Sequence, residues 1–265
     1  MSEHDTQITV CALQCASQLP KPHALLSLER STARTDPHTR YHADLQRDRR
    51  GVCHALIQMF GAEEIPQEGL AQEVRWRRDE LGKPYVAFEG KVAEWAESRG
   101  LHTQHLHVSN THDGQRQLLL TLYAPNVVGC GIDVVYTPRL SRPSQDRAFL
   151  QHFARKFMSS TEHEAIQVQL ETEEIERLRL RVAAHFSLME AASKACGTGL
   201  KVGLGMGTPS SLPMQSLGVR TLSPQVELLI EGQALTRLET MGATRSFAAW
   251  QLLDEYLVSL VLLFR

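Results

Sequence analysis

The stretch Val127–Tyr136, with the sequence VVGCGIDVVY, decides how this 265-residue chain folds. Its run of apolar and β-branched residues predicts a strand that is buried within the protein. Asp133 lies in the middle of that strand and is followed by two valines, so a turn does not account for its presence. A carboxylate is costly to bury unless it is paired or coordinates a metal ion. The stretch therefore predicts both a central strand and a functional aspartate.

A second stretch, Phe186–Leu200 (FSLMEAASKACGTGL), predicts the end of a long helix. The helical pattern begins near Thr172, where two acidic residues follow as the helix dipole favours, and it stops at Gly197. Glu190 and Lys194 are four residues apart, so they share one face of this helix. An exposed ion pair at this spacing contributes only a few tenths of a kcal/mol. The small and apolar residues around the pair favour instead a face that packs into a cleft.

Two shorter motifs precede these stretches and have the residue types of an anion site. In Arg78–Tyr85 (RDELGKPY), a Gly-Lys-Pro turn presents Lys83 on a stiff loop, which suits a phosphate. In Ser109–Gly114 (SNTHDG), small polar residues ahead of His112 offer backbone N–H groups and an imidazole. Each motif taken alone is more often a solvated surface turn. The hypothesis of anion binding depends on their combination with the later stretches.

The remaining pattern predicts an α+β fold with antiparallel sheets, because helices and strands do not alternate regularly. Apolar residues recur at helical spacing from Tyr41 to Phe60, and Gly61 follows as a C-cap. A capping-box pattern, Thr161 with Glu164, indicates another helix start. Strands are expected at residues 8–13, 105–109, 117–123, 225–231, 246–252 and 256–264, and loops at 31–40 and 203–224.

The two parts of the chain share a plan of a helix, a turn and then strands. This weak repeat places a boundary near Pro125. It predicts an N-terminal half of residues 1–125 and a C-terminal half of residues 126–265.

Composition limits the classes of function. The formal net charge of −2 argues against a nucleic-acid binder. The five cysteines are scattered without zinc-site spacing. The polar, acidic start has no basic region before an apolar stretch, and the longest apolar run, Tyr256 to Phe264, is too short to span a bilayer. A cytoplasmic protein without a membrane or nucleic-acid partner is expected.

Taken in order, the four motifs resemble the 4′-phosphopantetheinyl transferase superfamily. The Gly-Ile-Asp strand ending at Asp133 and the helix with Glu190-x-x-x-Lys194-Ala-x-Gly-x-Gly-Leu are similar to its signature pair, and the two upstream motifs to its earlier marks. The layout resembles the larger, monomeric pseudo-dimeric type, which includes the surfactin-synthetase activator and the aminoadipate-semialdehyde dehydrogenase transferase. The resemblance implies two similar halves, each a small antiparallel sheet packed with helices, with the active site in the cleft between them.

The resemblance also implies a reaction and its residues. The protein would transfer 4′-phosphopantetheine from coenzyme A to a serine of an apo carrier protein or domain (acyl, peptidyl or aminoadipate-reductase), releasing 3′,5′-ADP. Asp133 and Glu190 would ligate Mg²⁺, or Mn²⁺, and with Lys194 would form the catalytic set, Glu190 being the candidate general base. The other residues that the resemblance assigns to coenzyme A are Arg40, Arg78, Lys83, Asn110, Thr111 and His112.

Three positions depart from the family pattern. Val135 stands where a second acidic residue is often found, Met189 where a lysine usually precedes the helix glutamate, and Phe186 where tryptophan is usual. Methionine cannot bind a phosphate, so Met189 favours the alternative of a non-catalytic relative that binds coenzyme A or a carrier protein.

The residues suggest two further interpretations. The Gly203–Gly207 stretch (GLGMG) is similar to part of a dinucleotide loop, but Pro209 and Pro213 prevent a helix behind it, so a dehydrogenase is disfavoured. A set of basic residues either contacts the carrier or forms a solvated face; it comprises Arg139, Arg142, Arg147, Arg155 and Lys156.

Overall fold

The computed structural model describes residues 23–30, 37–61, 72–80, 83–113, 116–141, 146–198, 200–201, 212–213, 216–222 and 226–265. The chain divides into two compact units, residues 1–127 and 128–265, called here unit one and unit two. The strand predicted at residues 8–13 and the glycine-rich stretch 203–207 lie outside the described residues. Among the helices that the structure describes, none has the length and apolar character needed to cross a membrane.

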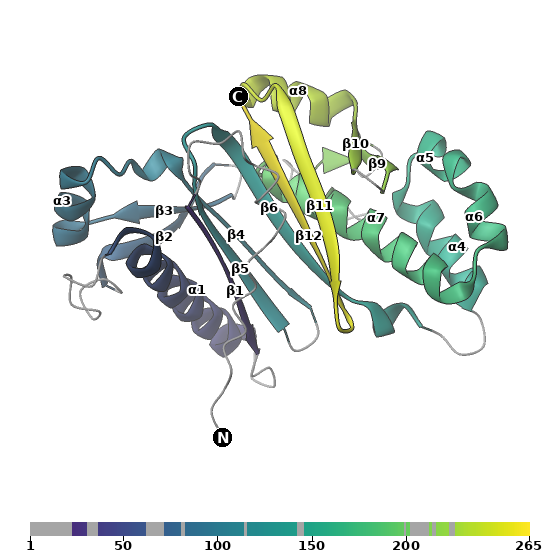
Figure 1. Ribbon diagram of the computed structural model, residues 1–265, viewed down its shortest axis with the longest axis horizontal. Coiled ribbons are helices and arrows are strands. Elements are labelled where there is room, and N and C mark those ends of the chain that lie inside the picture. Colours follow the sequence, from purple (N-terminus) through teal and green to yellow (C-terminus); the bar gives the residue numbers. More distant parts are fainter. Residues whose placement is uncertain are drawn as a thin grey trace. The chain divides into compact units, whose positions relative to one another are not determined.

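Unit one is built on a three-stranded antiparallel sheet with the order β1-β5-β4 (Figure 1). A long helix, α1, packs on this sheet, and a β2–β3 hairpin and the short helix α3 lie beside it. The elements are β1 (His23–Arg30), α1 (Pro37–Phe60), β2 (Val74–Arg78), β3 (Pro84–Phe88), α3 (Gly90–Ser98), η3 (Thr103–His105), β4 (Leu106–Asp113) and β5 (Arg116–Tyr123).

Helix α1 begins and ends where the residue types favour it. Pro37 occupies the first helical position, where its fixed φ is suitable and its missing N–H is not needed. Gly61 has φ of 70° and donates its N–H to the carbonyl of Ile57, as a helix-ending glycine does. Val52 and Leu56 are buried in the core of unit one, one helical turn apart. The helix therefore begins four residues before the predicted start, and the predicted loop at 31–40 is wrong for residues 37–40.

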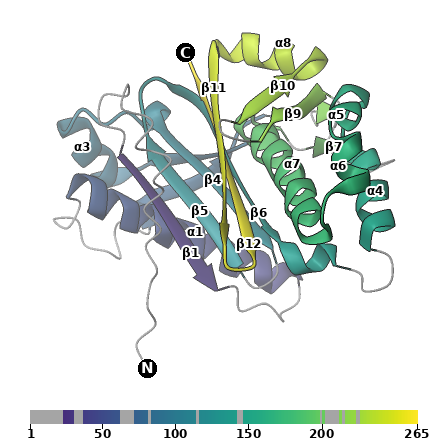
Figure 2. The same ribbon diagram turned by 45° about the vertical axis from the view of Figure 1, so that its right-hand side comes forward.

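Unit two contains a second three-stranded sheet, with the order β11-β12-β6, and a long helix, α7, that packs on it (Figures 1 and 2). Strands β11 and β12 are antiparallel, as are β9 and β10, whereas β7 and β8 form a short parallel pair. The elements are β6 (Val127–Tyr136), η4 (Thr137–Leu140), α4 (Asp146–Phe157), α5 (Ser160–Ala165), α6 (Gln167–Thr172), α7 (Ile175–Ala195), β7 (Leu200–Lys201), β8 (Leu212–Pro213), β9 (Leu217–Thr221), β10 (Glu227–Ile230), α8 (Gly232–Met241), β11 (Arg245–Leu253) and β12 (Tyr256–Phe264).

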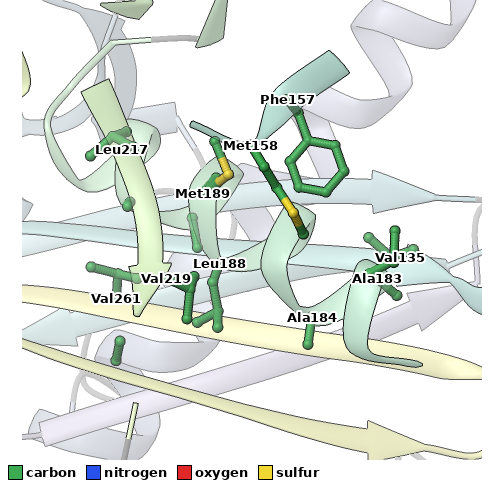
Figure 3. Packing of buried hydrophobic residues seen from close by; sticks show 14 of the residues in the cluster. Val135, Phe157, Met158, Ala183, Ala184, Leu188, Met189, Leu217, Val219 and Val261 are labelled. Atoms are coloured by element: carbon green, nitrogen blue, oxygen red, sulfur yellow. The ribbon is translucent and has the colours of Figure 1, made fainter. Parts of the chain in front are cut away.

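The core of unit two surrounds α7, which is buried on most of its circumference. Figure 3 shows Leu188 and Met189 of this helix among Phe157, Leu217 and Val261 from other elements. A helix that is buried on most of its sides lies inside a domain. Helix α7 is therefore the central element of this unit.

A buried polar contact connects α7 with α5 and β9. Nδ1 of His185 lies 2.6 Å from Oε1 of Glu162, and the same carboxylate oxygen accepts the N–H of Val219 at 2.9 Å. Both side chains are almost fully buried. The N-cap of α5 is Ser159, whose hydroxyl accepts the N–H of Glu162, so the capping pattern predicted at Thr161 lies two residues too late.

The predicted α+β class is confirmed, and β6 and β12 have the predicted bounds. One prediction about the site region is wrong: residues 110–113 continue β4 rather than forming a turn. Asn110 pairs with Leu119 and Asp113 with Arg116, so pairing with β5 decides their conformation. Strand β9 likewise lies within the predicted loop 203–224, and β1, α3, α4 and α8 were not foreseen.

Candidate functional site

Two glycines let the backbone of α7 lie directly on β6. A Cβ atom on Gly131 would lie 1.8 Å from the carbonyl oxygen of Ala191, and one on Gly129 would lie 2.1 Å from that of Ala195. Real Cβ atoms essentially never approach a neighbour within 3.0 Å, so any side chain at these positions would push the helix away. The Gly-x-Gly spacing therefore places the next inward residue of the strand, Asp133, against the helix.

Asp133 is paired with a lysine of α7. Lys194 donates through Nζ to Oδ1 of Asp133 at 2.9 Å and to the carbonyl oxygen of Ile132 at 3.1 Å. The aspartate is 7% exposed, and the lysine is partly exposed. A buried carboxylate needs such a partner, because an uncompensated charge in this environment is expensive.

Glu190 brings a second carboxylate to the same place, and its ionisation is altered there. The pKa of Glu190 is raised to about 7, chiefly because the group is buried and next because Asp133 carries a negative charge nearby. Lys194 and Arg139 lower the pKa of Glu190, but their combined effect is smaller. The charge of Asp133 thus lies near enough to Glu190 to make ionisation of Glu190 less favourable.

This arrangement fits a divalent cation that also has other ligands. Hard carboxylate oxygens are what Mg²⁺ prefers, and this ion usually takes only one or two carboxylates and completes its shell with water and phosphate. Across the described part of the chain, no group of three or more His, Cys, Asp or Glu residues is placed to hold a metal. Asp133 and Glu190 suit a metal that is shared with a phosphate ligand, because Mg²⁺ usually takes only one or two carboxylates.

The basic residues near the end of β6 differ in what they contact. Arg139, in η4, is exposed, and its charge acts on Glu190. Arg147 of α4 instead donates to the carbonyl oxygens of Leu170 and Glu173, so its guanidinium group is used to hold the end of α6. Arg155 and Lys156 are exposed near the end of α4, while Arg142 lies outside the described residues.

Met189 points away from the carboxylates into the apolar core. Its side chain is 0% exposed and lies beside Leu188, Met158 and Leu217 (Figure 3). Helical geometry explains the difference from Glu190, since adjacent residues are turned by 100°. In this fold position 189 serves packing.

The motifs that were assigned to coenzyme A by resemblance lie in unit one. Arg78 ends β2 and is exposed, and Lys83 precedes β3 in a turn that Asp79 closes: the Asp79 carboxylate accepts the N–H of Lys83 at 2.9 Å. Thr111 is buried within β4, whereas His112 is exposed. Arg40 lies in the first turns of α1.

Asn110 is engaged in an internal contact. Its side-chain amide donates to Oδ2 of Asp48 at 2.6 Å. The sequence analysis did not predict a role for Asp48, although this aspartate lies beside the apolar positions of a predicted helix.

Of the residues predicted for the site, the structure brings together Asp133, Glu190 and Lys194 in unit two.

Comparison with known proteins points to one superfamily for the segment that contains this site. Residues 129–257, just under half of the chain, match a sequence model described as the 4′-phosphopantetheinyl transferase superfamily. The predicted resemblance is confirmed at that level for this segment; the pseudo-dimeric type stays a prediction. A comparison with curated proteins finds no significant match.

Several solved structures of holo-acyl-carrier-protein synthases are similar to about half of the chain. The enzyme from Plasmodium yoelii is 18% identical, covers 52% of this chain and 94% of its own, and gives a TM-score of 0.38. That from Neisseria meningitidis is 20% identical, with 52% and 99% covered and a TM-score of 0.38. That from Bacillus anthracis, in complex with coenzyme A (3′,5′-ADP), is 21% identical, with 52% and 97% covered and a TM-score of 0.37.

Proposed function

We propose that the protein transfers 4′-phosphopantetheine from coenzyme A to a serine of an apo carrier protein. The observation that carries the proposal is the set Asp133, Glu190 and Lys194, held together by the direct contact of α7 with β6. The superfamily match over residues 129–257 supports it, because that segment contains all three side chains. The superfamily's reaction needs bound phosphates and a metal, and this set has the charges for both.

The reaction is a phosphoryl substitution. The serine hydroxyl oxygen attacks the phosphorus that bears the pantetheine arm, a new P–O bond forms, and the bond to 3′,5′-ADP breaks. Such transfers depend on positioning and on neutralising phosphate charge. Lys194 supplies a positive charge beside Asp133 for this purpose. Glu190 is the proposed general base that accepts the serine proton.

Asp133 and Glu190 are the proposed ligands of Mg²⁺, with Mn²⁺ as an alternative. When bound, the ion would neutralise negative charge on the diphosphate of coenzyme A. Asp133 is already oriented by its bond from Lys194, and Glu190 lies one helical turn before that lysine on α7.

The nucleotide end of coenzyme A is proposed to bind residues of unit one. Arg78 and Lys83 would contact the 3′-phosphate, because both basic residues lie at the end of the β2–β3 pair where Arg78 is opposite Pro84. Thr111 and His112 would contact phosphate from the end of β4, and Arg40 is retained from the resemblance alone. Asn110 would act through Asp48.

The alternative function, binding without transfer, is favoured by one observation. Met189 is enclosed by the core, so no cation reaches the site from this position. The buried carboxylate of Asp133 weighs against the alternative, since a charged group within an apolar strand costs stability that a scaffold need not lose.

The decisive experiment is the intact mass of an apo carrier protein after incubation with this protein, coenzyme A and Mg²⁺. A gain of one phosphopantetheine, absent without metal and absent with Asp133→Ala, is expected. Coenzyme A binding with no mass gain across acyl, peptidyl and aminoadipate-reductase carriers would establish the alternative instead.

A second measurement tests the general base. Glu190→Gln keeps the size of the side chain but cannot accept the proton, so a large loss of kcat is expected. The rise of the rate with pH that titration of a general base produces should also be lost. A variant that kept the normal rate and pH profile would exclude Glu190 from this role.

A set of exposed basic residues is the proposed contact surface for the carrier protein. Arg139, Arg155 and Lys156 are exposed and basic, so they suit an acidic carrier helix. A monomer is proposed from the resemblance, and a cytoplasmic location from the composition. Size-exclusion chromatography would test the oligomeric state.

A further inference from the structure

Asp48 is a buried carboxylate of unit one that holds two neighbouring strands. The residue is 3% exposed. Its Oδ2 accepts a hydrogen bond from Nδ2 of Asn110 at 2.6 Å, and its Oδ1 accepts one from Nε2 of Gln117 at 2.9 Å. One side chain of α1 is therefore bonded to both β4 and β5.

The two bonds lie next to the end of β4 that carries His112. His112 pairs directly with Gln117 across the two strands, and side chains two residues apart on a strand share a face. Asn110, His112 and Gln117 are therefore on the same face of the sheet. Asp48 contacts the two that flank His112, one along the strand and one across it.

Apolar packing also contributes to this helix–sheet contact. Val52 and Leu56 of α1 meet Val108 and Leu119 of the sheet in the core of unit one. A further apolar contact at Asp48 would hold the helix at lower cost, because burying a carboxylate is expensive even when it is hydrogen-bonded. What the carboxylate adds is direction, since two charge-assisted hydrogen bonds fix the positions of their donors.

We propose that Asp48 is a positioning residue for coenzyme A binding: it fixes the end of β4 so that His112 faces the ligand's phosphate. This inference rests on the proposed function. It changes the role of Asn110, whose amide is bonded to Asp48 and holds β4 to α1, so that ligand contact is left to Thr111 and His112.

The test measures the Kd of coenzyme A by calorimetry on the full chain, besides kcat and KM for carrier modification. Asp48→Asn keeps the size but places an amide donor against another donor, so the Kd and the KM for coenzyme A are expected to rise about tenfold with kcat within about twofold. In the double variant Asp48→Asn with Asn110→Asp, Asn at position 48 donates to the new carboxylate. Recovery of the Kd to within about threefold is expected.

A cycle with His112→Ala separates positioning from general stability. If Asp48 acts through His112, adding Asp48→Asn to His112→Ala causes little further loss of affinity. Should Asp48→Asn not fold at the assay temperature, Gln117→Met, which removes one donor only, replaces it with the same expected coupling.

Each outcome is decisive. An unchanged Kd in Asp48→Asn, or losses that simply add in the cycle, would overturn the inference. Coenzyme A binding without transfer to a carrier would refute the proposed function while leaving the Kd test of Asp48 intact. Absence of coenzyme A binding in the unaltered protein would overturn both.

Discussion

Replacing Gly131 by alanine should move α7 away from β6 and so separate Asp133 from Glu190 and Lys194. The new Cβ would lie 1.8 Å from the carbonyl oxygen of Ala191, and ordinary contact begins at 3.4 Å, so helix or strand must retreat by about 1.6 Å. The bond from Lys194 to Asp133, now 2.9 Å long, would then exceed the length of a hydrogen bond. Overpacking of this kind costs about 1–3 kcal/mol of stability. A displacement near 1 Å at a reacting group costs about a hundredfold in rate.

The assay is kcat/KM for carrier modification, with urea unfolding measured in parallel. Gly100→Ala is the matched control. Nothing lies within 4 Å of its would-be Cβ, but its φ of +65° disfavours alanine by about 1–2 kcal/mol, so stability falls without any displacement of α7. We expect similar losses of stability in the two variants and loss of activity in Gly131→Ala alone. Unchanged stability and activity in Gly131→Ala would refute the argument that the glycine contact positions the site.

Three further results are expected. Met189→Lys should lower the free energy of unfolding by several kcal/mol and should not raise the rate of transfer, because it buries an unpaired charge. Met189→Leu should lower the free energy of unfolding by less than about 1.5 kcal/mol. A stable Met189→Lys variant with faster transfer would show that position 189 reaches the phosphates. Saturating Mg²⁺ should raise the Tm of the unaltered protein and not that of Asp133→Asn, as binding to the folded state alone requires, and equal shifts would place the metal elsewhere. Burial lowers the pKa of His107 to about 4, so on acidification the unfolded chain takes up a proton near pH 6.5 while the folded chain does not. The free energy of unfolding should therefore fall by about 2–3 kcal/mol between pH 7.5 and 4.5. In urea unfolding, His107→Gln should show a correspondingly smaller fall.

Much of the candidate site could be predicted because its signals are local in the chain. An aspartate within an apolar strand and a Glu–Lys pair at helical spacing are both visible in the sequence, and the structure brings Asp133, Glu190 and Lys194 together. The bounds of β6 followed from its run of apolar and β-branched residues. The roles of these residues stay predictions until transfer is measured.

The parts that could not be predicted depend on contacts between distant segments. Residues 110–113 have the composition of a turn, yet pairing with β5 makes them a strand. The direction of Met189 depends on which face of α7 meets the core. Because α7 is buried on most of its sides, its apolar residues show no clear periodicity that would predict this direction. Asp48 became visible as a strand anchor only when its donors, 62 and 69 residues away, were placed beside it.

The glycine contact also implies which changes in chain length the protein can tolerate. Two residues along β6, from Gly129 to Gly131, span about 6.6 Å, and four residues along α7, from Ala191 to Ala195, rise about 6 Å. The two spacings match, so strand and helix fit in one register only. A single-residue deletion inside either matched segment would turn Asp133 or Glu190 to the wrong side, so these two short segments can change in length only together.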